Sequence, residues 1–127
     1  MKRTPLRRKG KSNVSQLRNK CDKLLQEEGK RRYRKCEVCD NPISCLHHFF
    51  PKSTSSRLRY DWGNLIPICN GCHMRHHQAG DPSIHAKIIL NRGQNWYDQL
   101  DRTRHEIIRV NKGYYEEILE ELENELL

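Results

Sequence analysis

Four cysteines occur as two Cys-x-x-Cys pairs, Cys36 with Cys39 and Cys69 with Cys72. Four thiolates arranged in two such pairs can hold a structural zinc ion in tetrahedral geometry. Gly71 would let the second pair turn tightly. Two pairs in one chain of 127 residues favour zinc over the alternatives, which are two disulfides or two redox dithiols. The sequence therefore predicts a four-cysteine zinc site whose binding free energy helps the chain to fold.

The other two cysteines, Cys21 and Cys45, are not part of these pairs. We expect both to be small buried side chains, which is the usual role of a free cysteine. Cys45 is near enough in sequence to the first pair that a role as a further zinc ligand is the alternative.

Five of the seven histidines lie beside the cysteines. His47 and His48 are adjacent, and adjacent residues of a strand point to opposite faces, so we expect the two to have different roles. His73 and His77 are four residues apart on a predicted helix and share a face, which suits two imidazole ligands of one metal ion. His76 is the competing ligand. The cluster predicts a catalytic metal site.

Composition and hydropathy limit the size of the core. Only 35% of the residues are hydrophobic and the mean hydropathy is −0.99, so a metal staple would supply stability that the core lacks. The sequence shows no leader-like apolar run and no apolar stretch of membrane length. We therefore expect a cytoplasmic protein with no membrane partner, a setting in which disulfides are rare.

Charge is distributed unevenly along the chain, which has a net charge of +8 and a pI near 9.4. Residues 1–35 hold 14 lysines and arginines against three acidic residues, whereas residues 114–127 hold six glutamates and no basic residue. A basic arm of this kind is typical of nucleic-acid binding, and we expect the acidic end to stay away from the nucleic acid. A solvated basic segment is the alternative.

The sequence divides into four regions around the predicted metal sites. Residues 1–11 are predicted to be a flexible basic tail, residues 12–35 a basic N-terminal helix, residues 36–80 the core, and residues 81–127 a C-terminal helical region. Within the core we expect strands at 43–49 and 64–69, a loop at 50–62 and a helix at 70–79.

Three helices are predicted in the C-terminal region. The first follows Asp81 and Pro82 and ends before Gly93. The second would run from Gln94 to Val110 with its apolar side chains turned inward, Ile107 and Ile108 among them. Gly113 is expected to separate it from a last, acidic amphipathic helix, whose apolar stripe would pack within the chain or form a homodimer.

The order Cys-x2-Cys, His-His, Asn, Cys-x2-Cys-His-x3-His over residues 36–77 resembles the HNH nucleases, also called His-Me finger or ββα-metal nucleases. More narrowly, the opening MKRTPLRRKGKS, the loop LRYDWGNLIPICNGC and the trailing helices resemble the small phage recombination nucleases of the NinG/Rap type. The resemblance implies a small α+β fold, in which a ββα-metal core is stapled by a four-cysteine zinc site and flanked by N- and C-terminal helices.

The resemblance also implies a role for each matching residue. His48 would be the general base that deprotonates the attacking water. Asn64 would hold the ββα loop together and help to orient that base. The catalytic divalent ion would be bound by His47, His73 and His77.

The implied reaction is hydrolysis of a DNA phosphodiester to give 5′-phosphate and 3′-hydroxyl ends. A histidine with a pKa near ~6.5 is a suitable base at neutral pH. One divalent ion can neutralise the phosphate and stabilise the leaving oxygen. Carboxylate ligands would favour Mg²⁺ or Mn²⁺, whereas an all-imidazole set also admits Zn²⁺, Ni²⁺ or Co²⁺.

Contacts to DNA are predicted from basic residues near the site. Lys52, Arg57, Arg59 and Arg75 are the candidates for phosphate contacts, and ordinary solvated surface is the alternative for each. Phosphate contacts position a protein on DNA without reading its sequence, so we expect a preference for DNA structure or a weak sequence preference.

We therefore expect a metal-dependent DNA endonuclease acting on double-stranded or branched DNA. Recombination intermediates are the substrate that the NinG/Rap resemblance implies, in a bacterial host and with phage replication or recombination proteins as partners. The alternative is a non-catalytic zinc-ribbon module that binds DNA or a replication or recombination protein. That alternative explains the cysteines and the basic arm, but it does not explain His48, Asn64 and His73 at matching places.

Overall fold

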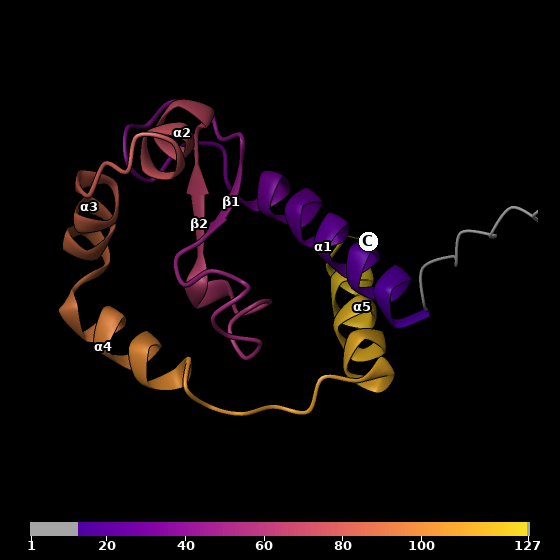
Figure 1. Ribbon diagram of the computed structural model, residues 1–127. Helices are drawn as coiled ribbons and strands as arrows, with labels where there is room; N and C mark the ends of the chain where they lie inside the picture. Colours follow the sequence, from indigo (N-terminus) through magenta and orange to yellow (C-terminus); the bar gives the residue numbers. More distant parts are fainter. Residues whose placement is uncertain (1–12, 127) are drawn as a thin grey trace, which may run out of the picture.

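The structure is a computed structural model and describes residues 13–126, so the basic tail predicted at residues 1–11 lies outside it. The chain forms a small α+β fold (Figure 1). No helix in this range is long and apolar enough to cross a membrane. The elements in chain order are α1 (Asn13–Arg32), β1 (Cys45–His48), the 3₁₀ helix η1 (Trp62–Asn64), β2 (Leu65–Ile68), α2 (Asn70–His77), α3 (Ser83–Arg92), α4 (Gln94–Thr103) and α5 (Lys112–Leu126).

The centre of the fold is an antiparallel pair of strands followed by a helix. His47 of β1 pairs with Ile66 of β2, and His48 pairs with Leu65. α2 begins directly after Cys69, whose side chain caps its N-terminus. This is the strand–strand–helix order that was expected for the region containing the cysteines and histidines.

The two faces of this sheet pack against different helices. On one face, Ile66 and Ile68 join a core with residues of α2, α3 and α4. On the other face, Leu46 and Leu65 join a second core with residues of α1 and α5. Because side chains alternate along a strand, His47 lies on the face of the first core and His48 on the face of the second.

α1 closes the free edge of β1. The Gln26 side chain accepts a hydrogen bond from the Leu46 backbone N–H (2.8 Å) and donates one to the Leu46 carbonyl (3.1 Å). Three residues later, Gly29 lies so close to the Leu46 side chain that an added Cβ would be 2.3 Å from Leu46 Cδ1. The glycine is therefore required for the close packing of the helix on the strand.

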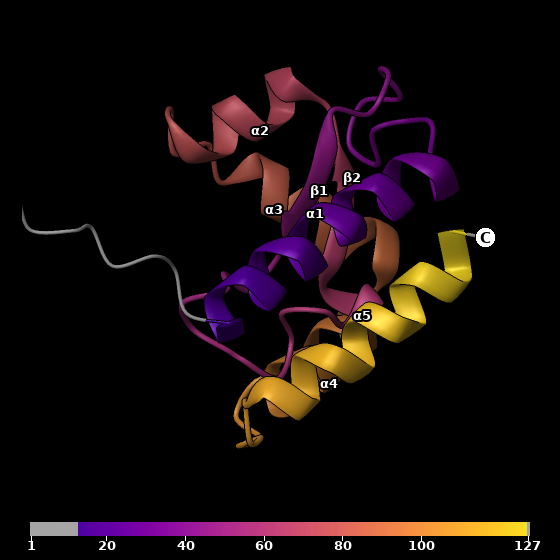
Figure 2. The same ribbon diagram turned by 90° about the vertical axis from the view of Figure 1, so that its right-hand side faces the viewer.

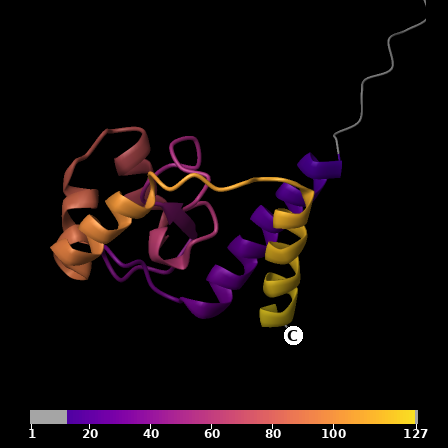
Figure 3. The same cartoon turned by 90° about the horizontal axis from the view of Figure 1, so that it is seen from below.

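The helices form two groups on either side of the strands. α1 lies alongside α5, while α3 packs against α2 and α4 (Figures 1 and 2). Seen from below, the two groups are joined by the segment between α4 and α5 (Figure 3). The apolar stripe of α5 faces α1 of the same chain, through Tyr115 and Leu122.

The structure corrects two helix boundaries. α4 ends at Thr103 and not at Val110, and Ile107, predicted to face inward, is 98% exposed. Arg104 is the C-cap of α4, and its N–H bonds to the Leu100 carbonyl (3.0 Å). The helix does not continue through the β-branched residues that come later, such as Ile107, because these have a lower helix propensity. Gly113 lies in the first turn of α5 instead of preceding the helix.

Candidate active site

The four cysteines of the two Cys-x-x-Cys pairs come together at the end of the sheet. Their sulfur atoms all lie within 4.8 Å of one another, and the Cys39 and Cys69 sulfurs are 3.4 Å apart. Two sulfurs of a tetrahedral zinc site are separated by ~3.8 Å, given Zn–S bonds of ~2.3 Å. All six cysteines of the chain are free thiols. The geometry therefore fits a zinc ion and excludes the disulfide alternative in this structure.

Hydrogen bonds around the four thiols favour the ionised form of Cys69 in particular. The Cys36 sulfur accepts a hydrogen bond from the Val38 N–H, and the Cys69 sulfur accepts one from the Cys72 N–H, both at 3.4 Å. Burial raises the pKa of Cys69, but the hydrogen bonds from Cys72 and the neighbouring thiols outweigh it and lower this pKa to about 7. A thiolate forms readily there, as zinc ligation requires.

Neither remaining cysteine joins this group. Cys21 is fully buried between α1 and α5, and its thiol donates to the Tyr115 carbonyl (3.3 Å), as expected of a small buried side chain. Cys45 is half-buried with its sulfur 3.5 Å from His73 Nδ1. It therefore lies beside the histidines and not among the zinc-type thiols.

His48 is held by a single backbone contact that determines its tautomer. Its Nε2 is 2.9 Å from the Arg59 carbonyl oxygen, and a carbonyl can only accept, so Nε2 carries the proton. Nδ1 is then left with a free lone pair. Burial lowers the pKa of His48 from its ordinary value, which keeps the imidazole neutral at neutral pH. The arrangement is that of a base ready to take a proton at Nδ1.

Asn64 ties together the two ends of the loop that supplies the Arg59 carbonyl. It is fully buried, its side-chain oxygen accepts the Phe50 N–H (2.8 Å), and its amide donates to the Phe50 and Leu58 carbonyls. Leu58 precedes Arg59 directly. The asparagine thereby fixes the backbone that orients His48.

The same loop is anchored on α1 through Asp22. The Asp22 carboxylate accepts hydrogen bonds from the Arg59 guanidinium and from the Tyr60 hydroxyl (2.8 Å). Hydrogen bonds from two neighbours to one carboxylate fix the segment on both sides of the Arg59 carbonyl. A helix outside the ββα unit therefore contributes to the orientation of His48, which sequence reasoning did not anticipate.

Three imidazoles converge on the opposite face of β1. One ring nitrogen each of His47, His73 and His77 lies within 4.8 Å of the others. Their ring planes are inclined to one another by 66° to 82°. Since the lone pair of an imidazole nitrogen lies in the ring plane, mutually inclined rings can point to a common centre. The three residues fit a divalent ion with nitrogen ligands.

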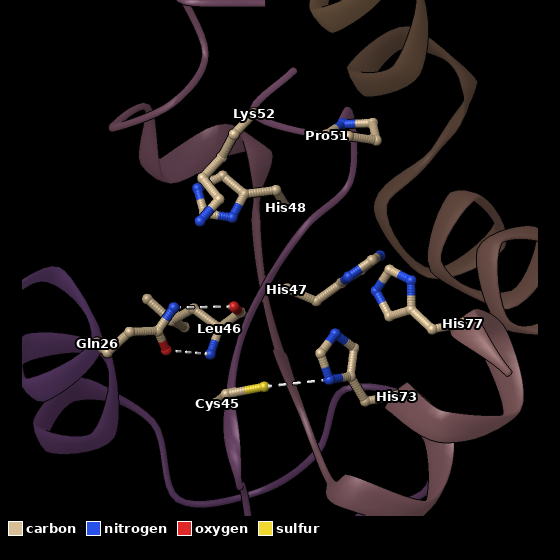
Figure 4. A pocket seen from close by; sticks show the side chains of 9 residues that line it. All are labelled: Gln26, Cys45, Leu46, His47, His48, Pro51, Lys52, His73 and His77. Atoms are coloured by element: carbon tan, nitrogen blue, oxygen red, sulfur yellow. Dashed lines mark hydrogen bonds between the residues drawn. The ribbon is translucent and has the colours of Figure 1, made fainter. Parts of the chain in front are cut away.

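One cavity of about 370 Å³ is lined by His48 and by the three imidazoles (Figure 4). His48 points to one side of β1, toward Lys52, and His47 points to the other, toward His77 and His73. The division of the two adjacent histidines that strand geometry predicted is therefore observed. The cavity is open to solvent at Pro51 and Lys52, both of which are exposed.

Comparison with known families agrees with this geometry. Residues 36–79 match the sequence model of the HNH endonuclease family. Residues 36–79 are an HNH domain. The match spans both cysteine pairs, the paired histidines, Asn64 and the helix with His73 and His77. The narrower resemblance to phage NinG/Rap nucleases stays a prediction.

A search of known proteins found one that matches a stretch about as long as the HNH domain. Over 47 residues the chain is 36% identical to a protein from Sarcophyton glaucum described as a mitochondrial DNA mismatch repair protein mutS homolog. The match covers 34% of this chain and 5% of that protein, so this chain spans a small fraction of the relative's length. No solved structure matches the chain.

The HNH domain is joined by a histidine from α3 that sequence reasoning missed. The Nε2 atoms of His85 and His47 are 2.9 Å apart, and the His85 ring stacks on Phe49 with centroids 4.2 Å apart. A signal was present in the sequence, because position 85 lies three and four residues before Ile88 and Ile89. A histidine on the apolar face of a helix that follows His-x3-His is a candidate for the same site.

His47 is the centre of this group of imidazoles. It is 4% exposed, and its ring centroid lies 5.0 to 5.2 Å from those of four other histidines, His73, His76, His77 and His85. Burial and then the neighbouring imidazoles lower the pKa of His47 to about 2, and burial lowers that of His85 to about 4. Both rings are neutral at physiological pH, which is the state that can bind a metal ion.

The basic residues predicted to contact phosphate differ in their surroundings. Lys52 is exposed at the cavity of the HNH domain. The other three pair with carboxylates of the chain: Arg57 with Asp61 and Glu106, Arg59 with Asp22, and Arg75 with Asp81. These ion pairs would compete with any bound anion, whereas Lys52 is exposed at the cavity.

Proposed function

We propose that the chain is a metal-dependent DNA endonuclease. One observation carries the proposal: His48 offers a free Nδ1 in the same cavity as a three-imidazole metal-type site, inside an HNH domain. A base and a metal site within one cavity are what phosphodiester hydrolysis requires. A purely structural zinc module has no use for either.

In the proposed reaction, His48 Nδ1 accepts a proton from the attacking water while Nε2 stays bonded to the Arg59 carbonyl. Asn64 keeps that carbonyl in place. His47, His73 and His77 would hold the divalent ion, which when bound would supply neutralisation of the charge on the phosphate and on the leaving 3′ oxygen. Lys52 at the mouth of the cavity attracts the DNA backbone. The products are 5′-phosphate and 3′-hydroxyl ends.

Two features support a broad choice of metal and a structural role for zinc. The imidazole ligand set suits Mn²⁺, Zn²⁺, Ni²⁺ or Co²⁺ as well as Mg²⁺, and the four thiols suit Zn²⁺.

The rival proposal, a non-catalytic zinc module that binds DNA or a replication or recombination protein, rests on the same thiols and the basic N-terminal segment. It leaves the three-imidazole group and the tautomer of His48 without a purpose.

The test measures whether the zinc-loaded protein cleaves supercoiled plasmid and a four-way junction. Each substrate is offered with Mg²⁺, Mn²⁺, Ni²⁺ or excess Zn²⁺. We expect nicking or linearisation that a chelator abolishes, and faster cutting of the junction if branched recombination intermediates are the substrate. DNA binding without cleavage under any of these metals would favour the non-catalytic module. Sedimentation of the protein alone and with the junction tests whether it forms a homodimer.

A further inference from the structure

His85 forms a contact that the proposed catalytic site does not use. Its Nε2 lies 2.9 Å from Nε2 of the buried His47, and its ring is held flat against Phe49, with an angle of 19° between the two planes. Both imidazoles are neutral, so this separation requires that one of the two nitrogens carries a proton shared with the other.

A divalent ion could take the place of that proton. Two imidazole nitrogens on one tetrahedral zinc ion are separated by ~3.3 Å, given Zn–N bonds of ~2.0 Å, which is a few tenths of an ångström more than observed here. The His47 and His85 ring planes are inclined by 53°, so their lone pairs can point to one centre.

His76 supplies a third nitrogen. A ring nitrogen of His76 lies within 4.8 Å of those of His47 and His85. The His76 and His85 rings are stacked, with centroids 4.0 Å apart and planes 14° from parallel, and two parallel rings cannot both point to one ion. One ring must turn on binding. His85 is fixed by Phe49 and His47, so His76 is the ring that turns.

We propose that His47, His76 and His85 form a second site for a transition-metal ion, of the Zn²⁺, Ni²⁺ or Co²⁺ class. Three neutral imidazoles and no carboxylate disfavour Mg²⁺. The site is weaker than the one formed by His47, His73 and His77, because those three rings are already mutually inclined and need no turn.

The two sites exclude each other through His47. A neutral imidazole has one lone pair to give, so His47 serves one ion at a time. An ion on the second site removes a ligand from the first. If the chain is the proposed nuclease, a molecule with an ion on the second site therefore lacks His47 as a ligand of the catalytic ion, and this consequence alone rests on the proposed function.

The binding claim is tested without DNA. The full-length protein is loaded with one zinc ion at the four cysteines, and Co²⁺ is titrated while its d–d absorption is recorded. The absence of a thiolate–cobalt charge-transfer band shows that the cysteine site keeps its zinc. The variants are His77→Ala, which disables the first site at an exposed residue, His85→Gln, which disables the second, and the two combined. His105→Ala removes an exposed histidine outside the group and is the matched control.

We expect the wild type, the control and each single variant to bind about one Co²⁺, with a weaker and spectrally distinct complex for His77→Ala, and the double variant to bind none. Loss of all binding in His77→Ala would overturn the second site, and so would a double variant that binds as well as His77→Ala does. Far-ultraviolet circular dichroism and zinc content show whether each variant is folded. Should the double variant not fold, His76→Gln replaces His85→Gln in it with the same expectations.

Discussion

At the scale of single residues, the proposed function depends on which nitrogen of His48 carries the proton. The Arg59 carbonyl holds that proton on Nε2, and burial lowers the pKa of the ring. The adjacent His47, one residue earlier on the strand, is committed to the imidazole group on the other face. The alternation of a β-strand thus places two identical side chains in different surroundings.

The lowered pKa of His48 gives a pH prediction with a definite sign. A base is active when unprotonated, so the cleavage rate should be lost as the pH falls through the pKa of His48. Because that pKa lies below the ordinary value of 6.5, the midpoint of the acid limb should also lie below 6.5. The measurement is single-turnover cleavage at saturating Mn²⁺. A midpoint above pH 7 would contradict a neutral, half-buried base.

Asn64 gives a second residue-scale prediction. Asn64→Ala removes hydrogen bonds to the Phe50 N–H and to two carbonyls at a fully buried position. We expect the free energy of unfolding to fall by about 3 kcal/mol, since the backbone groups lose their partners. Urea denaturation of the zinc-loaded protein measures this. The exposed Asn95→Ala is the control, and an equal, small change in both would show that Asn64 does not hold the loop.

At the scale of elements, the positions of α1 and α3 relative to the ββα unit determine how the side chains of the candidate site are arranged. α1 fixes the strand edge through Gln26, and through Asp22 it fixes the loop whose Arg59 carbonyl contacts His48. α3 brings His85 to His47 because Ile84 and Ile88 pack into the core shared with β2.

The sequence predicted the ββα unit well and these helix positions poorly. The spacing of cysteines and histidines within residues 36–77 reflects local geometry, which a pattern can reveal. The spacing of His85 from Ile88 and Ile89 indicates its face of α3, but its contact with His47 depends on how α3 packs on the sheet, which no local pattern encodes. The early end of α4 was missed for a related reason, since apolar residues such as Ile107 continue the helical period although they stay exposed.

Gly29 tests the packing of α1 on β1. Alanine is favoured over glycine in a helix by about 1 kcal/mol, but at this position its Cβ would overlap the buried Leu46 side chain. We expect Gly29→Ala to destabilise the fold by about 1–3 kcal/mol in denaturant unfolding. Gly113→Ala in α5 is the matched control, because its Cβ would meet only Asn111 at 3.4 Å. Stabilisation by Gly29→Ala would show that α1 does not sit this close to the strand.

At the scale of the whole molecule, the first and last helices, which carry opposite net charge, lie side by side. α5 is acidic and lies alongside the basic α1, with ion pairs from Lys20 to Glu123 and from Arg32 to Glu125. The acidic end was expected to stay away from nucleic acid. Its contact with α1 means that one side of this helix is neutralised, so DNA is expected to approach from the side of the cavity.

The four-cysteine group is the other feature that acts on the whole molecule, because it joins the turn before β1 to the start of α2. Cys69→Ser should release the tightly held zinc and unfold the HNH domain, since zinc binding supplies folding free energy that a small core lacks. Zinc content and the thermal midpoint measure this. Cys45→Ser is the control, because Cys45 lies beside His73 and outside the four-thiol group. An unchanged midpoint for Cys69→Ser would contradict the structural role.

The most direct test of the proposed nuclease is the nicking of supercoiled plasmid by wild type and His48→Ala in Mn²⁺, with zinc content and DNA affinity measured on the same samples. His105→Ala serves as the control for loss of a histidine. We predict that His48→Ala keeps its zinc and its DNA binding but cleaves at least about 10²-fold more slowly, as expected when a general base is removed. Cleavage by His48→Ala at the wild-type rate would contradict the assignment of His48 as the base.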